Sequence, residues 1–336
     1  MYKRQSKYST GEDYESYLLQ NKISGLGSRK ELKNLLQGQQ MYVGTIASVL
    51  GKRDLFDLVA FDLAIVDEAS QILEHALLGL LSRVKKFILI GDHQQLPAVV
   101  QQHDLQSKVD DEELNKLGVL DFRNSLFERL YNQARNFGWE HAYGKLTYQG
   151  RMHQELMEFP SRYFYQNELK VLPSLNGLKQ QFLTDAYPNN NTNFLYDYRK
   201  IYIPSSSDSH NENIKVNQFE ADICVEILAL LISHYTAGNN AIRPDQIGII
   251  TPYRAQIALI KKKLEEKEVP YHQHVTIDTV ERYQGGARDI IIMSTCMNYS
   301  FQMRSLVSLS STGVDRKLNV ALTRACLLYT SPSPRD

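Results

Sequence analysis

Two neighbouring carboxylates, Asp67 and Glu68, are the clearest candidates for chemistry in this sequence. They directly follow four apolar residues, 63–66, and precede Ala69 and Ser70. Such a run suits a strand buried on both faces of a parallel sheet, and open α/β sheets bind ligands at the carboxyl ends of their strands. One carboxylate there could hold Mg²⁺, and the next could polarise a water molecule that attacks a phosphate. On its own, the pair could equally be the solvated acidic end of a strand.

The same arrangement recurs further along the chain, where the apolar-rich residues 86–90 lead into Gly91 and a polar segment that ends at Pro97. A glycine at this place would let the backbone turn tightly beside a phosphate. The neutral amide of Gln95 could donate a hydrogen bond to a phosphate oxygen and accept one from water. A polar surface turn is the alternative interpretation of this segment.

Short apolar segments alternate with helical segments over most of the chain, which predicts an α/β fold with parallel sheets flanked by helices. The pattern restarts near Gly144, so we expect two such domains, at residues 6–143 and 144–325. Strands are predicted at 41–46, 63–66, 86–90, 246–250, 275–279 and 290–293. Helices are predicted at 28–37, 72–81, 124–136, 155–165, 219–235, 256–267 and 318–325.

Composition excludes several classes of protein. The 336 residues are 43% hydrophobic and 23% charged, as is ordinary for a soluble globular protein. Lys plus Arg and Asp plus Glu both number 38, so no overall positive charge favours nucleic acid, although a local groove could still be basic. Three cysteines without metal-type spacing or disulfide density suit a reducing, cytoplasmic location. No apolar run reaches roughly 18 residues, so no membrane span is expected.

Both ends of the sequence are predicted to be foreign to the protein. Residues 1–5 and 326–336 correspond to the translation of a transposon-type sequencing adaptor, and we therefore exclude both segments from the fold. A genuine tail rich in serine and proline is the alternative. If the adaptor interpretation holds, the native sequence is an internal fragment of a longer protein.

Six segments together resemble the tandem RecA-like core of superfamily 1 helicases, closest to the 5′-to-3′ branch that acts in nonsense-mediated decay and Okazaki-fragment processing. They cover most of residues 41–325 and occur in the family's order. In this sequence they read IVDEAS at 65–70, IGDHQQLPAV at 90–99, LTYQGRMH at 146–153, IGIITPYRAQ at 247–256, VTIDTVERYQGGARDIII at 275–292 and LNVALTRA at 318–325. The first domain would carry two of these motifs and the second domain the others.

The resemblance implies an ATP-dependent helicase with ATP and Mg²⁺ as cofactors. Asp67 would hold Mg²⁺, Glu68 would orient and deprotonate water, and Gln95 would sense the γ-phosphate. Arg151 and Arg324 match two arginines that reach the γ-phosphate from the second domain, where a guanidinium offers two donors to phosphate oxygens. Other implied nucleotide contacts are Gly91, Asp92, Gln149, Gln284, Gly285 and Gly286.

The implied partner is single-stranded or forked nucleic acid, either DNA or RNA, and the parent protein could carry a fused nuclease or another domain. The hydroxyls of Thr45 and Ser48 lie at the exit of a predicted strand and could bind a phosphate backbone, but they are also ordinary residues of a helix start. Thr279 could touch the strand or simply fill a β-strand. Thr251, Tyr253 and Arg254 resemble a family segment near bound nucleic acid.

The sequence departs from the family in several places, one of which is Ala98, where relatives usually have a second proline after Pro97. Gly150 stands where relatives often have a tyrosine that stacks on adenine, which leaves Tyr148 as a possible substitute. Ala287 stands where relatives often have a glutamate that contacts the ribose. No G-x-x-x-x-G-K-[ST] segment, the loop that cradles phosphates, occurs in the sequence. We therefore expect the first domain to be incomplete and this chain not to hydrolyse ATP. A non-catalytic nucleic-acid-binding scaffold or regulatory module is the alternative function.

Overall fold

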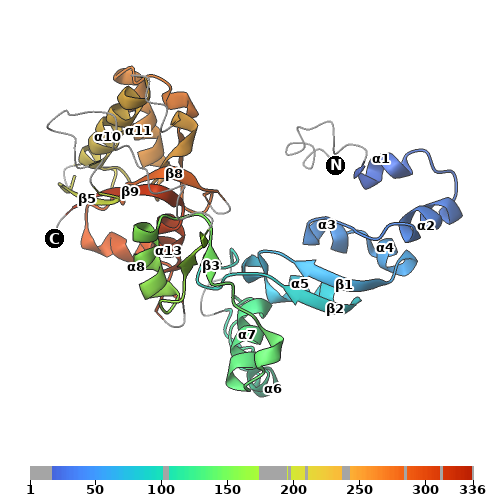
Figure 1. The fold of residues 1–336 in the computed structure, drawn as a ribbon. Helices are drawn as coiled ribbons and strands as arrows, with labels where there is room; N and C mark the ends of the chain where they lie inside the picture. The colour runs from blue at the N-terminus through green and yellow to red at the C-terminus, as the bar shows by residue number, and fades with distance from the viewer. Residues whose placement is uncertain are drawn as a thin grey trace. The chain divides into compact units, whose positions relative to one another are not determined.

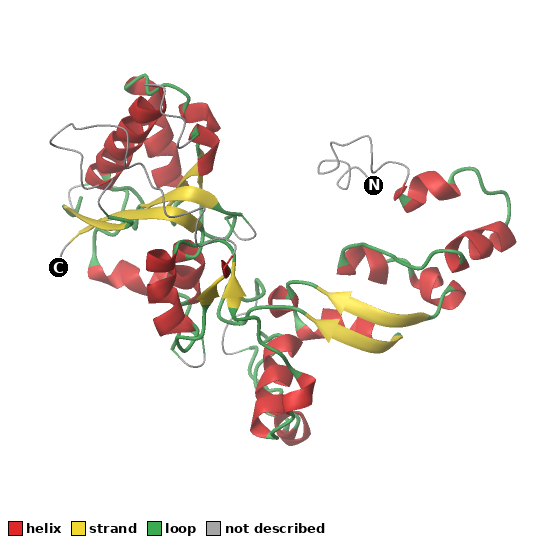
Figure 2. Cartoon of the chain, viewed as in Figure 1, coloured by secondary structure: helices red, strands yellow, loops and turns green. Residues whose placement is uncertain are grey.

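The computed structural model describes residues 17–100, 106–173, 195, 198–208, 211–236, 243–283, 286–310 and 313–334. The chain divides into two compact units. Unit 1 comprises Met1–Gly91 and Ala98–Leu130, and unit 2 comprises Asp92–Pro97 and Tyr131–Asp336. Each unit combines parallel strands with helices, which confirms the predicted α/β class (Figure 2). The exact domain limits at 143 and 144 stay a prediction.

Unit 1 is built on two parallel strands, β1 (Phe61–Val66) and β2 (Val84–Leu89), with helix α5 (Glu74–Leu81) between them in the sequence. Its small core contains Val66, Ala69, Leu77 and Leu126. The other helices with residues in this unit are α1 (Leu19–Ile23), α2 (Arg29–Gln37), α3 (Ile46–Leu50), α4 (Arg53–Leu58), α6 (Glu112–Lys116) and α7 (Leu126–Asn136).

Two expectations for unit 1 are wrong. The strand at 63–66 is present, but it is not buried on both faces, since Ile65 is 62% exposed and only Val66 reaches the core. In the described part of this unit β1 has β2 as its single strand neighbour. The strand predicted at 41–46 is absent, because Ile46 begins α3 instead and the Thr45 hydroxyl accepts a hydrogen bond from Ser48 N at 3.2 Å. Thr45 therefore acts as a helix cap.

Unit 2 contains a five-stranded, all-parallel sheet with the order β5-β9-β8-β6-β7. Helices α10 and α11 cover one face of the sheet, and helices α8 and α13 cover the other (Figure 1). The strands are β5 (Lys200–Ser205), β6 (Ile247–Ile250), β7 (Thr276–Asp278), β8 (Arg288–Met293) and β9 (Ala325–Pro334). The helices are α8 (Gln154–Phe164), α10 (Gln218–Thr236), α11 (Arg254–Glu266), α12 (Met303–Leu306) and α13 (Arg316–Leu322), and β3 (Tyr148–Gln149) pairs with β4 (Lys170–Val171) in a separate small sheet.

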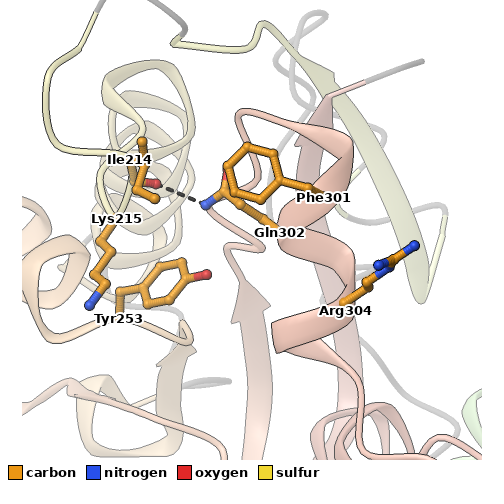
Figure 3. A pocket seen from close by; sticks show the side chains of 6 residues that line it. All are labelled: Ile214, Lys215, Tyr253, Phe301, Gln302 and Arg304. Carbon is orange, nitrogen blue, oxygen red and sulfur yellow. Dashed lines mark hydrogen bonds between the residues drawn. The ribbon is translucent and has the colours of Figure 1, made fainter.

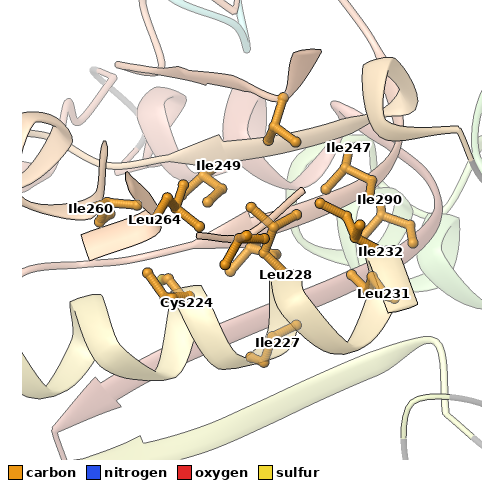
Figure 4. Close-up of a cluster of buried hydrophobic side chains, with 14 of the residues drawn as sticks. Cys224, Ile227, Leu228, Leu231, Ile232, Ile247, Ile249, Ile260, Leu264 and Ile290 are labelled. Carbon is orange, nitrogen blue, oxygen red and sulfur yellow. The ribbon is translucent and has the colours of Figure 1, made fainter. Parts of the chain in front are cut away.

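Residues 290–293 of strand β8 are all apolar, because both faces of this part of the strand are covered. Ile290 and Ile292 join the core beneath α10 and α11, whereas Ile291 joins the core beside α8 and α13. Figure 4 shows the first of these cores, to which Ile290 belongs together with Leu228 and Ile232 of α10. Side chains alternate between the faces of a strand, so a strand covered on both sides needs apolar residues at every position. The predicted buried strand at 290–293 is thus confirmed.

The exclusion of residues 326–336 from the fold is wrong, because Ala325–Pro334 form strand β9 inside the sheet. Its residues pair with β8 on one side and with β5 on the other, as in the opposition of Tyr329 to both Ile291 and Lys200. Leu328 has no exposed surface and belongs to the core. The adaptor origin of this segment stays a prediction, and residues 1–5, 335 and 336 lie outside the described residues.

Within the described residues, no helix has the length and apolar character needed to cross a bilayer.

Gly248 on β6 provides a test of how closely unit 2 is packed. A Cβ atom at this position would lie 2.5 Å from the Tyr283 hydroxyl and 3.0 Å from Cδ1 of Ile291. Both neighbours are core residues, so we expect Gly248→Ala to lower the free energy of unfolding by about 1–3 kcal/mol through overpacking. Urea unfolding followed by circular dichroism measures the change. Gly144→Ala is the matched control, since a Cβ there meets nothing within 4 Å, and equal midpoints for the two variants would contradict the expectation.

Candidate functional site

Asp67 and Glu68 form an exposed turn directly after β1. Glu68 N donates to Asp67 Oδ1 at 2.9 Å, and the Gln71 side-chain amide donates to Glu68 Oε2. Glu68 adopts a left-handed conformation with φ 52°, which is uncommon for a residue other than glycine and is frequent at functional sites. The two side chains therefore leave the strand end on a tight, side-chain-stabilised turn.

The donor set at this turn fits Mg²⁺ rather than a metal enclosed by protein. Asp67 offers one exposed carboxylate, and the described residues contain no group of three or more His, Cys, Asp or Glu side chains suited to a metal ion. Mg²⁺ commonly takes only one or two carboxylates from the protein and completes its shell with water and substrate phosphates. Asp67 is thus suitable as the single protein carboxylate for a phosphate-bound Mg²⁺.

Gly91 is required where the ends of β1 and β2 meet. Ala69 N donates to Ile90 O at 2.8 Å, which brings the turn after β1 against the end of β2. A Cβ on Gly91 would lie 2.9 Å from Ser70 N, closer than real Cβ contacts. The glycine predicted to allow a close approach to phosphate therefore already allows a close approach to the Asp67–Glu68 turn.

Residues 92–97 belong to unit 2, where the half-buried Tyr165 anchors them. The Tyr165 hydroxyl donates to Asp92 Oδ2 at 2.6 Å, and the Gln95 amide donates to the same oxygen at 2.8 Å. Burial, followed by the negative charge of Asp92, raises the pKa of Tyr165 well above its usual value. The phenol consequently stays protonated and keeps donating to the carboxylate at physiological pH.

Helix α13 holds the backbone of the same loop. Arg316 Nε donates to His93 O at 2.8 Å, and Asn319 Nδ2 donates to Gln94 O at 2.8 Å and to the Tyr165 hydroxyl at 3.0 Å. Leu96 is buried in the core shared with α8 and α13. The loop is therefore bound to unit 2 by its backbone, by its side chains and by apolar packing.

Arg324 links this loop to the last turn before β9. Its guanidinium donates to Gln95 Oε1 at 2.9 Å, to Gly286 O at 3.2 Å and to Val320 O at 3.1 Å. The residue is 2% exposed. The structure thus joins two residues predicted to contact the γ-phosphate, Gln95 and Arg324, with the predicted nucleotide contact at Gly286.

Arg151 approaches the same end of α13 from another segment. Gln149 Oε1 accepts from Arg151 N at 2.9 Å and from Met152 N at 2.7 Å, which fixes the turn that carries the arginine. Arg151 Nη1 then donates to Thr323 O at 3.2 Å, one residue before Arg324. The two predicted arginines and Gln149 therefore belong to one local cluster.

Known proteins resemble this chain over most of its length. A family model described as an AAA domain matches residues 122–329, and a second model with the same description matches residues 3–103. The bovine "DNA replication ATP-dependent helicase/nuclease DNA2" is 30% identical over 326 residues, which cover 90% of this chain and 27% of that protein. The Saccharomyces cerevisiae "ATP-dependent helicase NAM7" is 29% identical over 353 residues, covering 94% of this chain and 32% of that protein.

The chain belongs to the superfamily 1 helicases. The predicted family and its 5′-to-3′ branch are confirmed by these matches. The chain spans about 27–32% of the length of these two relatives. Among solved structures, "The structure of PRRSV helicase" has 12% identity and a TM-score of 0.36, with 81% of this chain and 35% of that chain covered.

Three residues that bind the 92–97 loop are not among the sequence predictions: Tyr165, Arg316 and Asn319. Asn319 lies within the LNVALTRA segment, so the motif itself was a signal, whereas nothing local distinguishes Tyr165 from an ordinary helix-end tyrosine. Asn319 Oδ1 and Gln94 Oε1 are buried and accept no hydrogen bond from the described residues. The cluster therefore retains polar acceptors beyond those that the loop uses.

The other residues predicted for the site differ in what the structure shows of them. Gln284 and Gly285 fall outside the described residues. Tyr148, the possible adenine contact, is 54% exposed and has the Lys170 ammonium 5.8 Å from its ring centroid. Thr279 is half-buried after β7, and its N–H donates to Asp278 Oδ1 at 2.8 Å.

The three residues after β6 have different environments. Thr251 is fully buried, and its hydroxyl has no hydrogen-bond partner among the described residues. Tyr253 is half-buried and Arg254 is exposed at the start of α11. Of the three residues, only Tyr253 and Arg254 have side chains that a strand of nucleic acid could reach.

Proposed function

We propose that this chain is part of an ATP-dependent helicase, in which ATP hydrolysis drives movement along nucleic acid and separation of strands. The observation that carries the proposal is the hydrogen bond of 2.9 Å between Gln95 and Arg324. It connects a phosphate-sensing amide to a cation suited to the transition state of phosphoryl transfer. Both family membership and the local geometry support the same assignment.

In this proposal each of five polar side chains has a distinct role. Asp67 holds Mg²⁺, which neutralises charge on the β- and γ-phosphates when it is bound. Glu68 orients the attacking water and accepts a proton from it, and Gln95 senses the γ-phosphate. Arg151 and Arg324 stabilise the negative charge that spreads over the transferred phosphoryl oxygens.

The Gln95–Arg324 bond also suggests how nucleotide would be sensed. A γ-phosphate beside Gln95 would compete with Gln95 Oε1 for the guanidinium of Arg324, because a charged acceptor forms the stronger hydrogen bond. Arg324 immediately precedes β9, so a change of its hydrogen-bond partner would shift the start of that strand. Cycles of this exchange would alternate the contacts of residues 92–97 with α13 and thereby drive strand movement.

The substrate is proposed to be single-stranded or forked nucleic acid, DNA or RNA. Tyr253 and Arg254 are proposed to contact it, and Thr251, Thr279, Thr45 and Ser48 stay weaker predictions. A fused nuclease in the parent protein is proposed by analogy with the helicase/nuclease name of the bovine relative. A reducing, cytoplasmic location is proposed because the three cysteines, Cys224, Cys296 and Cys326, are buried thiols without metal-type spacing.

A non-catalytic nucleic-acid-binding module is a second candidate function. The observation that favours it is the absence of a G-x-x-x-x-G-K-[ST] segment from the 336 residues. Without that loop the phosphates lack their backbone cradle and the lysine that accompanies it. Retention of the Asp67–Glu68 turn and of both arginines favours the enzyme.

Measurement of ATP hydrolysis separates these functions. We expect the 336-residue chain to release no phosphate from ATP, whereas a longer protein that includes a phosphate-binding loop hydrolyses ATP in the presence of single-stranded nucleic acid. In the longer protein, Glu68→Gln should lower the rate by roughly 10²- to 10⁴-fold, since it removes the general base. Glu112→Gln, an exposed acid on α6, is the matched control and should leave the rate unchanged.

Two results would contradict this assignment. Hydrolysis by the 336-residue chain that disappears on Glu68→Gln would show that a phosphate-binding loop is not needed. A longer protein that binds nucleic acid, contains the loop and still lacks ATP hydrolysis and strand displacement would favour the non-catalytic module.

A further inference from the structure

A pocket of about 530 Å³ lies where three segments of unit 2 meet (Figure 3). Two of these segments, which include Tyr253 and Phe301, follow β6 and β8, and ligands of parallel sheets bind at this carboxyl edge. The third segment precedes α10. The pocket is lined by Ile214, Lys215, Tyr253, Phe301, Gln302 and Arg304.

Buried amides hold the walls of this pocket together. Gln302 is 2% exposed, and its Nε2 donates to Ile214 O at 2.9 Å while its Oε1 accepts from Asn298 N at 2.9 Å. Asn298 Nδ2 donates to Val216 O at 2.7 Å. Fully satisfied amides of this kind fix backbone segments in one arrangement, so the short helix that carries Phe301 is anchored to residues 214–216.

Two further buried side chains, Gln256 and Glu220, hold the segments around the pocket in place. Gln256, in the first turn of α11, donates to Asn217 O at 2.9 Å and accepts from Asn217 N at 2.9 Å. The carboxylate of Glu220 accepts from Ser294 Oγ at 2.6 Å and from Cys296 N at 2.8 Å, which secures the segment after β8. Burial raises the pKa of Glu220, and the hydrogen bonds to its carboxylate oppose that rise. The pocket therefore has a preorganised frame.

The side chains at the mouth of the pocket combine aromatic rings with positive charge. Phe301 is 61% exposed and stacks on Tyr299 with 5.5 Å between ring centroids and 17° between ring planes. Lys215 and Arg304 are exposed, and neither forms an ion pair with the described part of the chain. An exposed ring with adjacent unpaired cations matches the stacking surfaces and basic grooves that bind single strands of nucleic acid.

We propose that this pocket binds one base of a single-stranded nucleic acid, with Phe301 stacking on the base and with Lys215 and Arg304 contacting the phosphates beside it. The inference rests on the proposed function and adds to it a base-binding position on the segment after β8. Tyr253, which lies beside Lys215 in Figure 3, connects this position to the strand contacts already proposed for residues 253 and 254. Because every base has an aromatic face, the site is expected to bind without strong sequence preference.

Binding of fluorescent oligo-dT and oligo-U strands of about 15 nucleotides to the 336-residue chain tests the pocket. We expect Phe301→Ala to weaken binding roughly 5- to 150-fold, which corresponds to the loss of one stacked base. Arg304→Ala should weaken binding and reduce the salt dependence by about one phosphate contact. The two strands distinguish DNA from RNA as the preferred ligand.

Matched controls come from unit 2 itself. Phe137→Ala removes another exposed phenyl ring, which stacks on Trp139 at 5.2 Å, and Lys261→Ala removes an exposed cation from α11. Both should bind as the unchanged chain does. Thermal unfolding of each variant verifies that the fold is retained.

The outcomes separate the pocket from the proposed function. Binding by the unchanged chain together with unaltered affinity of Phe301→Ala would overturn the pocket and leave the helicase assignment intact. Absence of binding by the unchanged chain would overturn the pocket and also count against the strand contacts proposed for residues 253 and 254. Equal weakening by Phe137→Ala and Phe301→Ala would overturn the specific role of Phe301.

Discussion

Replacement of Arg324 by lysine is expected to lower ATP hydrolysis by roughly 10³- to 10⁵-fold in a longer protein that supplies the phosphate-binding loop. The guanidinium of Arg324 donates in three directions at once, to Gln95, to Gly286 and to Val320. An ammonium group is a compact point charge and cannot reproduce this planar arrangement. Steady-state phosphate release at saturating ATP and nucleic acid measures the loss.

Arg199→Lys is the matched control for this substitution. Arg199 is also almost fully buried in unit 2 and donates to a backbone oxygen, Leu327 O, at 3.2 Å, but it lies outside the candidate site. We expect it to affect stability without lowering the catalytic rate of the folded protein.

Arg324→Ala and Gln95→Ala can also be combined in the 336-residue chain, where urea unfolding should give a coupling energy of about 0.5–3 kcal/mol. A coupling energy of zero would contradict the importance of the Gln95–Arg324 bond.

Truncation after Ala325 is expected to prevent unit 2 from folding. The truncation removes nearly all of β9, and with it the strand that pairs with both β5 and β8. The loss should exceed about 5 kcal/mol, which is comparable to the whole stability of an ordinary domain. Circular dichroism and near-ultraviolet signals of the truncated chain, compared with those of the full chain, measure the effect.

A graded substitution keeps this expectation testable if the truncated chain is insoluble. Leu328 has no exposed surface, so Leu328→Ala should lower the free energy of unfolding by about 2–5 kcal/mol. Leu309 is 61% exposed in the same unit, and Leu309→Ala should change it by less than about 0.5 kcal/mol. A native-like truncated chain, or equal effects of the two substitutions, would show that β9 does not complete the sheet.

Apolar runs in the sequence predicted strands better than they predicted burial. The runs at 63–66 and 290–293 look alike, and both form parallel strands. Strand β8 lies between β9 and β6 and has helices on both faces, whereas β1 has one strand neighbour and leaves Ile65 exposed. Burial depends on neighbours distant in sequence, which a local pattern does not contain.

Some residues of the candidate site were predictable from local sequence and others were not. Asp67, Glu68, Gln95 and Arg324 were predicted because each lies in a short motif with a recognisable order of residue types. Tyr165 could not be predicted, since its role comes from a hydrogen bond to Asp92, 73 residues earlier in the chain. For Thr45 the sequence left two roles open: its hydroxyl caps α3, and its contact with a phosphate backbone stays a prediction.

The interior position of β9 sets an order for folding during protein synthesis. Strand β5 has β9 as its strand partner in the described sheet, and that partner lies about 130 residues further along the chain. At ribosomal rates of 5–20 residues per second, β5 would wait roughly 6 to 26 seconds before its partner is synthesised. During that interval the nascent chain presents an unpaired strand edge, which is a template for pairing with other chains. Slower translation near residue 325 would lengthen this vulnerable period, whereas slower translation before residue 200 would not.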